Sequence, residues 1–342
     1  MVSTYEYCRL SDGRAVTAYE ISNSFGESAV ILNYGATIGA LRVLDRDGQI
    51  SDVVLGADPG QDISVTPYVG SLMGRCGNRI ANASFQIDGR QFHLKPMEGP
   101  HHLHGADGNW ARQLFEGQVG RQSVTLRHID DGKDGWECPV EAEITYQFDD
   151  SHALTLTYQV KALGDTVISP TNHAYFNLNA PQQVLDTQLQ IFTDQYAPKS
   201  EFHMPDGTIR SVRDTPLDFS QPRTFRQALD AGPKDFFPDY QESFDDFYLV
   251  PGNGFRQMAQ AYCPANGRQL SIYSDAQTVI LYTPVLHTPI QNKGGKRYEG
   301  HIAFCLETQF MPNAVNCPEY RSPVFRKGQT MHSKTVYAFD VR

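Results

Sequence analysis

The sequence predicts an all-β protein, built as a sandwich or a barrel of many short strands. Short apolar runs rich in β-branched and aromatic residues recur along the chain, which is the pattern of strands rather than of long helices. The 28 glycines and 20 prolines supply turn residues between these runs, and helix signals are few. Alternating strand and helix units, and with them a parallel sheet, are therefore not expected.

The strand-like runs are spread over nearly the whole chain. They lie at residues 29–32, 53–55, 142–148, 154–160, 279–282 and 337–341. Residues 85–94 alternate between apolar and polar on both sides of Asp88-Gly89, and an Asp-Gly pair in this setting predicts a tight β-hairpin. A second hairpin is expected to turn at residues 149–151.

One short helix is expected, because Thr224 and Gln227 form a capping-box pattern and Gly232 supplies a stop after about two turns. The segment from His203 to Asp246 is otherwise irregular. It holds Pro205, Pro216, Pro222, Pro233 and Pro238. A long irregular segment is often functional, and the alternative is a surface excursion over one sheet. No linker divides the chain, so we expect one domain spanning residues 1–342.

Composition narrows the class of protein. With 342 residues, 40% of them hydrophobic, the chain has enough apolar material for a large core. The 29 basic and 39 acidic residues give a net charge of −10, which disfavours nucleic acid and anionic membrane surfaces as partners. Residues 1–15 lack the apolar segment of a signal peptide, and no apolar run reaches the length of a membrane span. The six cysteines are scattered, so we expect a reducing, cytoplasmic environment.

Five segments carry more polar chemistry than a β core requires. They are Gly74–Ile80, His101–Gly105, Ser169–Leu178, Phe244–Tyr248 and Phe304–Phe310. The first holds two arginines and an asparagine but lacks the lysine of a phosphate-binding loop. Its arginines suit hydroxyl or carboxylate recognition, and the alternative is a turn with solvated arginines.

Three histidines in the second segment suggest a metal site, but neighbours in an extended chain face opposite sides, so we expect no zinc site. His104, before a glycine, could donate a hydrogen bond in a pocket or lie on a surface turn. His173, in the third segment, suits proton transfer near neutral pH, and the alternative is a hydrogen-bonded core histidine. Asp245 and Asp246 lie among aromatic residues, either in a site or at solvated strand ends.

Glu307 stands in a strongly apolar run in the fifth segment. A glutamate is rarely buried unless it is paired or used in a reaction. Strand alternation offers the other interpretation, in which Glu307 points outward while Leu306 points inward.

Taken together and in this order, these segments resemble the aldose 1-epimerase (galactose mutarotase) family over most of the chain. The motifs that carry the resemblance are Gly74-Arg75…Asn78-Arg79-Ile80, Leu103-His104-Gly105, Thr171-Asn172-His173-Ala174-Tyr175-Phe176-Asn177-Leu178 and Leu306-Glu307-Thr308-Gln309, with support from Pro216-Leu217-Asp218-Phe219 and Asn313-Ala314-Val315-Asn316. The resemblance implies a large antiparallel β-sandwich of the galactose mutarotase type, with a sugar bound in a cleft over one sheet.

The resemblance also implies roles for individual residues. By motif match, Glu307 is expected to be the general base and His173 the general acid. Hydroxyl groups of the sugar would be bound by Asn78, Arg79, His104 and Asp245. Opening a cyclic hemiacetal requires one base at the C1 hydroxyl and one acid at the ring oxygen, and these two residues supply such a pair. We expect Glu307 ionised and His173 protonated, with Asp245 favouring the imidazolium, and no metal or other cofactor.

The sequence departs from the family pattern at three places. Ile280 stands where many relatives have glutamine, so one hydroxyl contact is expected to be missing and the sugar preference is open. Asp246 follows Asp245 where a histidine is common, which leaves open which aspartate faces the sugar. Gly105-Ala106 replaces the usual second glycine.

Other functions on the same scaffold stay open at this point. A hexose-phosphate mutarotase would need a cationic clamp, which Lys293, Lys296 and Arg297 could supply, although a solvated loop is the alternative. A non-catalytic sugar-binding protein would not need both Glu307 and His173. A glycosidase would need a second carboxylate beside Glu307. The expected partner is a small aldose, and the expected assembly is a monomer or a homodimer.

Overall fold

The structure is a computed structural model that describes residues 1–65, 68–232 and 243–342. Strands dominate it, as predicted. In the described part of the chain the one α-helix is α1 (Phe225–Asp230), whose start carries the expected reciprocal bonds between Thr224 and Gln227. The helix ends at Asp230 with Ala231 as its C-cap, so Gly232, the predicted stop, follows directly. Short 3₁₀ helices lie at Ile63–Val65, Ala81–Ala83, Ala106–Gly108, Trp110–Arg112, Val184–Asp186, Glu201–His203, Lys293–Gly295 and Ala314–Asn316.

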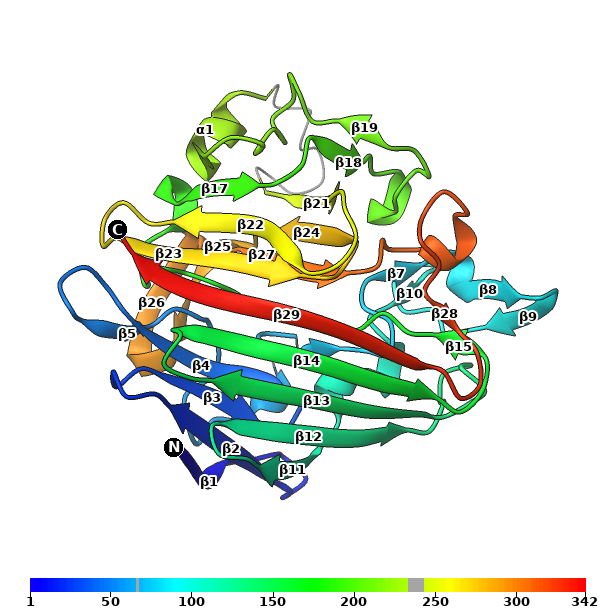
Figure 1. The fold of residues 1–342 in the computed structure, drawn as a ribbon, viewed down its shortest axis with the longest axis horizontal. Helices are drawn as coiled ribbons and strands as arrows, with labels where there is room; N and C mark the ends of the chain where they lie inside the picture. The colour runs from blue at the N-terminus through cyan, green and yellow to red at the C-terminus, as the bar shows by residue number, and fades with distance from the viewer. Residues whose placement is uncertain (66–67, 233–242) are drawn as a thin grey trace.

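A nine-stranded antiparallel sheet crosses the molecule from one side to the other (Figure 1). Its strands, in spatial order, are β11 (Glu116–Val119), β12 (Ser123–Asp130), β13 (Val140–Phe148), β14 (Ala153–Ala162), β29 (Thr330–Val341), β23 (Arg268–Ser274), β22 (Arg256–Tyr262), β17 (Gln188–Ile191) and β20 (Arg223–Thr224). The turn between β13 and β14 confirms the second predicted hairpin. The last strand, β29, joins the two halves of this sheet by pairing with β14 on one side and β23 on the other.

Two five-stranded sheets are also antiparallel. The first is a meander of β1 (Val2–Arg9), β2 (Ala15–Ser22), β3 (Ser28–Leu32), β4 (Thr37–Leu44) and β5 (Ile50–Asp52). The second has the order β19 (Arg210–Ser211), β18 (Gln195–Ala197), β21 (Asp245–Leu249), β24 (Thr278–Tyr282) and β27 (Cys305–Gln309).

Several strand pairs complete the fold. They are β6 (Leu72–Met73) with β16 (Thr171–Asn172), β7 (Arg79–Ile80) with β10 (His102–Leu103), β8 (Ser84–Ile87) with β9 (Arg90–His93), β15 (Thr166–Val167) with β28 (Val324–Phe325), and β25 (Val285–Asn292) with β26 (Lys296–His301). The β8–β9 pair confirms the predicted Asp-Gly hairpin. Asp88 and Gly89 have φ values of 50° and 81°, the left-handed backbone that a tight hairpin turn requires.

The main hydrophobic core lies between the sheets, which makes the fold a sandwich. Along β12, β13 and β14 the apolar side chains point inward, so that Leu126, Ile144 and Leu156 are fully buried. The same core includes residues of β3 and β4, and Leu281 and Leu306 from the second five-stranded sheet. In the described residues, no helix has the length and apolar character needed to cross a membrane.

The irregular segment 203–246 is more than a surface excursion. Phe219 and Phe225 are buried in the main core, and the segment ends on β21. Two of its five prolines, Pro233 and Pro238, lie outside the described residues.

Candidate active site

The register of β21, β24 and β27 determines which side chains share a face. Asp245 pairs with Tyr282, and Ile280 pairs with Glu307. Directly paired residues lie on one face, and neighbours along a strand lie on opposite faces. Asp245 and Glu307 therefore project from the same face, whereas Leu306 and Leu281 project from the other face into the main core.

Asp246 lies on the core-side face, away from Glu307. Its carboxylate is 3.2 Å from Nζ of Lys199, and burial raises its pKa. The two adjacent aspartates thus differ in environment, and only Asp245 shares a face with Glu307.

Glu307 and His173 form a buried pair. The backbone after β16 brings Nε2 of His173 to 3.6 Å from Oε1 of Glu307, and both side chains are almost completely buried. The ring of His173 stacks on Tyr175 with a centroid distance of 4.9 Å and meets the edge of Tyr282. Two aromatic rings therefore fix the orientation of the imidazole next to the carboxyl group.

Burial shifts the pKa values of both members of this pair. Burial, and then the charge of Asp245, raise the pKa of Glu307 from 4.5 to about 8, although Arg79 lowers it. Burial lowers the pKa of His173 from 6.5 to about 4. Burial therefore opposes the ionised Glu307 and the protonated His173 that the resemblance implies, because desolvation disfavours the charged form of each group.

Two adjoining segments carry three more of the predicted site residues. Asn78 and Arg79 lie at the start of β7, and His104 follows β10, which pairs with β7. The backbone N–H of Asn78 donates to Nδ1 of His104 at 3.0 Å, so the proton of this imidazole is on Nε2. Burial, His173 and Arg79 together lower the pKa of His104, which keeps the ring neutral. The rings of His104 and His173 have a centroid distance of 5.8 Å.

Arg79 connects these segments to Asp245. Its Nη1 lies 3.8 Å from Oδ2 of Asp245, and its Nε and Nη2 donate to both carboxylate oxygens of Glu98. The structure therefore brings all six predicted site residues into one continuous cluster. Sugar hydroxyls both donate and accept hydrogen bonds, and this cluster offers a guanidinium donor, a carboxylate acceptor, an amide and an imidazole N–H.

The solvated-arginine interpretation of the first segment is wrong. Arg75 is 1% exposed and forms a bidentate ion pair with Asp130 of β12, at 3.0 and 2.6 Å. Trp110 donates its indole N–H to the same carboxylate. Arg75 thus anchors the loop that carries Asn78 and Arg79 to the nine-stranded sheet.

The three clustered histidines have separate partners, as expected from their spacing. Nδ1 of His101 accepts from the backbone of Asn82, and Nδ1 of His102 contacts the carbonyl of Lys95. Over the described ranges, no group of three histidine, cysteine or acidic side chains could hold a metal ion.

Sequence reasoning missed residues that complete the cluster. The ring of Tyr282 contacts His173, and the carboxylate of Glu98 accepts from Arg79. Nδ1 of His203 lies 4.0 Å from Oδ2 of Asp245. Of these, only Glu98 carries a local signal, an acidic residue before a Gly-Pro turn. The others become neighbours of the site through strand pairing and loop packing.

Two expectations about specificity also meet the structure here. Ile280 is fully buried beside Glu307 in an apolar cluster with Phe247 and Met311. The loop with Lys293 is not simply solvated, because Nζ of Lys293 donates to Asp52 at 2.8 Å and to the carbonyl of Val54. Lys293 is therefore engaged, which leaves Lys296 and Arg297 as the exposed cations of the proposed phosphate clamp.

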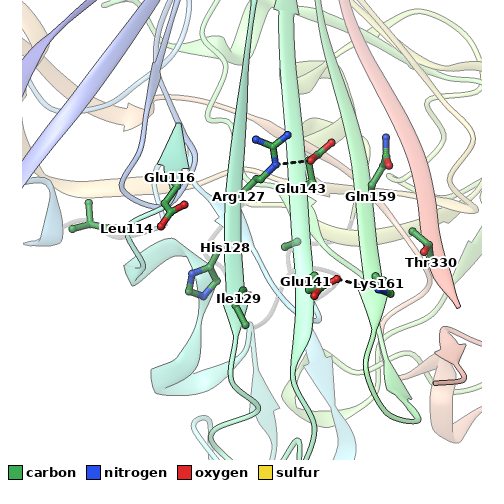
Figure 2. Close-up of a pocket in the computed structure, with 11 residues that line it drawn as sticks. Leu114, Glu116, Arg127, His128, Ile129, Glu141, Glu143, Gln159, Lys161 and Thr330 are labelled. Carbon is green, nitrogen blue, oxygen red and sulfur yellow. Dashed lines mark hydrogen bonds and ion pairs between the residues drawn. The ribbon is translucent and has the colours of Figure 1, made fainter. Parts of the chain in front are cut away.

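A groove lies on the outer face of the nine-stranded sheet (Figure 2). This groove has a volume of about 600 Å³ and is lined by side chains of β11 to β14 and β29. Figure 2 shows its two ion pairs, Arg127 with Glu143 and Lys161 with Glu141. These charges neutralise each other, and the groove lacks a buried acid–base pair.

Comparisons with known proteins agree on one family. The family model described as aldose 1-epimerase matches residues 17–338. A galactose mutarotase from Homo sapiens is 33% identical over 317 residues, which cover 91% of this chain and 90% of the relative. An aldose 1-epimerase from Escherichia coli K12 is 27% identical over 340 residues, 96% of each chain.

Solved structures give the same result. An aldose epimerase homologue from C. elegans superimposes with a TM-score of 0.84 at 27% identity, covering 94% of this chain and 98% of the other. A galactose 1-epimerase from Lactobacillus acidophilus superimposes with a TM-score of 0.85 over 100% of this chain and 99% of the other. At 21% identity, this second likeness supports the fold alone.

Proposed function

The chain belongs to the aldose 1-epimerase family and is an isomerase that interconverts the α and β anomers of an aldose, and we propose that Glu307 and His173 carry out its proton transfers. The observation that supports this assignment is their buried contact, with Nε2 and Oε1 3.6 Å apart. One proton shared by a carboxyl group and an imidazole is the minimum that ring opening and closing require.

In the proposed mechanism, the proton count of the pair stays constant. For ring opening, ionised Glu307 removes the C1 hydroxyl proton while protonated His173 donates to the ring oxygen as its bond to C1 breaks. The products are a neutral pair and an open aldehyde. The aldehyde then rotates about the C1–C2 bond. His173 removes the proton from the former ring oxygen as this oxygen attacks C1, and Glu307 returns its proton to the aldehyde oxygen.

Burial favours the neutral forms of both groups, which also supports a second assignment. In it, His173 is the base at the C1 hydroxyl and protonated Glu307 is the acid at the ring oxygen. The two assignments contain the same number of protons, so pH profiles alone cannot separate them.

A 1,5-anhydrohexitol can separate the two assignments, because it keeps the ring oxygen but lacks the C1 hydroxyl. If His173 is the acid, binding this compound should raise the pKa of its imidazole, measured by ¹⁵N NMR titration with His173→Asn as the assignment control. If Glu307 is the acid, the pKa of His173 should be the same with and without the 1,5-anhydrohexitol.

We further propose that Asn78, Arg79, His104 and Asp245 bind the hydroxyl groups of an aldohexose such as galactose or glucose. Their support is the mixture of fixed donors and acceptors beside the acid–base pair. A sugar phosphate is less well supported, because Lys293 is bound to Asp52. Comparing mutarotation of galactose with that of glucose 6-phosphate would test this preference.

The proposed roles are tested by Glu307→Gln and His173→Asn, which keep approximate shape but remove proton transfer. Polarimetry on freshly dissolved α-D-galactose and α-D-glucose should show that each variant loses about 10²–10⁴-fold in rate. Calorimetric titration should still detect sugar binding, and the double variant should lose less than the product of the single losses. A folded, sugar-binding Glu307→Gln variant with near wild-type rate would contradict the assignment, and wild-type binding without mutarotation would favour a sugar-binding protein.

A further inference from the structure

Two buried polar side chains lie beside the catalytic pair, and the mechanism above does not use them. Gln309 projects from β27 on the same face as Glu307, two residues further along the strand, and is 3% exposed. Thr171 is fully buried on β16, two residues before His173. The strands β16 and β27 pack against each other. Thr171 and Gln309 are each two residues away from a member of the catalytic pair, Thr171 from His173 and Gln309 from Glu307.

Gly77 shows how closely these side chains approach the loop above them. A Cβ atom at Gly77 would lie 2.5 Å from Oε1 of Gln309 and 2.8 Å from Cγ2 of Thr171. Both side chains therefore lie against the loop that carries Asn78, and a side chain at position 77 would collide with them unless they moved.

Four polar atoms of this group have no hydrogen-bond partner among the residues that the structure describes. They are Oε1 and Nε2 of Gln309, Oγ1 of Thr171 and Oε2 of Glu307, all buried. An unsatisfied buried polar group is costly, and natural interiors normally satisfy such groups with protein or bound water. An amide, a hydroxyl and a carboxyl oxygen supply the two to four polar contacts that a bound water needs.

We propose that Gln309 and Thr171 are positioning residues that hold one water molecule against Oε2 of Glu307, while Oε1 is the oxygen that lies 3.6 Å from Nε2 of His173. This inference rests on the proposed role of Glu307. The water would donate to Oε2, fix the rotation of the carboxyl group and favour its ionised form. Gln309 and Thr171 act through Glu307 and do not touch the sugar.

Other groups that face Glu307 set the background for this effect. Asp245 raises the pKa of Glu307 and Arg79 lowers it, and neutral His173 is the direct partner. Tyr175, Tyr282, Tyr337 and Cys305 are near enough for the charge of Glu307 to raise their pKa values. Hydroxyl and thiol groups with raised pKa values stay neutral near pH 8, so they do not titrate together with Glu307.

The test measures the protonation of Glu307 directly, by difference infrared spectroscopy of its carboxylic-acid band. The band is assigned as the one absent from Glu307→Gln. Removing the amide in Gln309→Met, or the hydroxyl in Thr171→Val, should raise the pKa of Glu307 by about one unit, because each loses a hydrogen-bonded contact to the ionised form. Thr171→Ser keeps the hydroxyl and should restore the wild-type titration.

Thr308→Val is the matched control on the same strand. Its hydroxyl contacts Thr335 on the core-side face, so this variant should leave the titration of Glu307 unchanged. In Gln309→Met we expect kcat to fall about tenfold with KM changed by less than about threefold. The double variant Gln309→Met/Thr171→Val should match the larger single effect, because both residues hold the same water.

An unchanged Glu307 titration in both Gln309→Met and Thr171→Val would overturn the proposal, whatever happens to activity. Independent, additive shifts would also overturn it, because they would show two separate effects and not one shared water. If the titration shifts but Glu307→Gln retains mutarotation, the positioning role stands and the proposed function of Glu307 fails.

Discussion

Replacing Glu307 by glutamine should stabilise the protein at alkaline pH while it removes activity. The perturbation deletes a buried carboxyl group whose pKa is raised, mainly by desolvation, from 4.5 to about 8. Below pH 4.5 this group is protonated in both the folded and the unfolded chain and has no pH-linked effect. Between pH 4.5 and 8 the unfolded chain releases the proton and the folded chain keeps it, so stability is lost as the pH rises.

The size of this loss follows from the shift. The difference between 4.5 and about 8 corresponds to about 5 kcal/mol, at about 1.36 kcal/mol per pKa unit. The pKa of His173 is about 4 in the folded chain and 6.5 in the unfolded chain, so this residue contributes to the pH dependence only below about pH 6.5. Above pH 6.5 the effect of Glu307 is therefore isolated, and the 1.5 units from 6.5 to 8 correspond to about 2 kcal/mol.

Urea unfolding of wild type and Glu307→Gln at pH 5, 6.5 and 9 would measure this difference. We expect the variant to gain stability relative to wild type by about 2 kcal/mol between pH 6.5 and 9. Glu299→Gln, at an exposed position on β26, should show no such gain. A difference between wild type and Glu307→Gln that stays flat from pH 5 to 9 would refute the claim that burial keeps this carboxyl group protonated.

Three further predictions concern the surroundings of the pair. The profile of kcat/KM against pH should be bell-shaped, with its acid limb at about pH 4 and its alkaline limb at about pH 8. Asp245→Asn should shift the alkaline limb to lower pH, because it removes a negative charge that raises the pKa of Glu307. An unmoved limb would show that Asp245 does not act on the pair. Ile280→Gln should change the ratio of activities on galactose and glucose and, because the site is fully buried, lower stability by about 1–3 kcal/mol; an unchanged ratio over a panel of C4 epimers and deoxy sugars would place Ile280 outside the sugar site. Arg75→Met should cost about 3–5 kcal/mol of stability by leaving Asp130 unpaired, and Arg75→Met/Asp130→Asn should recover part of it in chemical unfolding; no recovery would mean that packing and not charge dominates there.

Local features of the fold were predictable because neighbours in sequence determine them. The Asp88-Gly89 turn and the Thr224 cap both depend on residues within a few positions, and both are present. The helix end was predictable as well, because Gly232 directly follows the C-cap residue Ala231. The order of strands was not predictable, because pairing of β14 with β29 joins residues that are 169 to 185 positions apart.

In the candidate site, too, some features could be predicted from the sequence and others could not. Motif resemblance identified six residues that the structure brings together, and the register explains why Asp245 and not Asp246 lies beside Glu307. The effect of burial on the pKa values of the pair could not be predicted, because one sequence does not show which side chains are buried. Likewise, Arg75 reads as a solvated turn residue until its partner Asp130, 55 residues away, is known.

The central position of β29 constrains the order in which the protein can be made. During synthesis, β11–β14 and the strands β17, β20, β22 and β23 leave the ribosome as two sets with unpaired edges, at β14 and β23. Only residues 330–341 close both edges at once. Before that, each edge exposes free backbone donors and acceptors and invites pairing with other chains. We therefore expect nascent chains stalled before residue 330 to depend on chaperones, and loss of this one strand to prevent assembly of the large sheet.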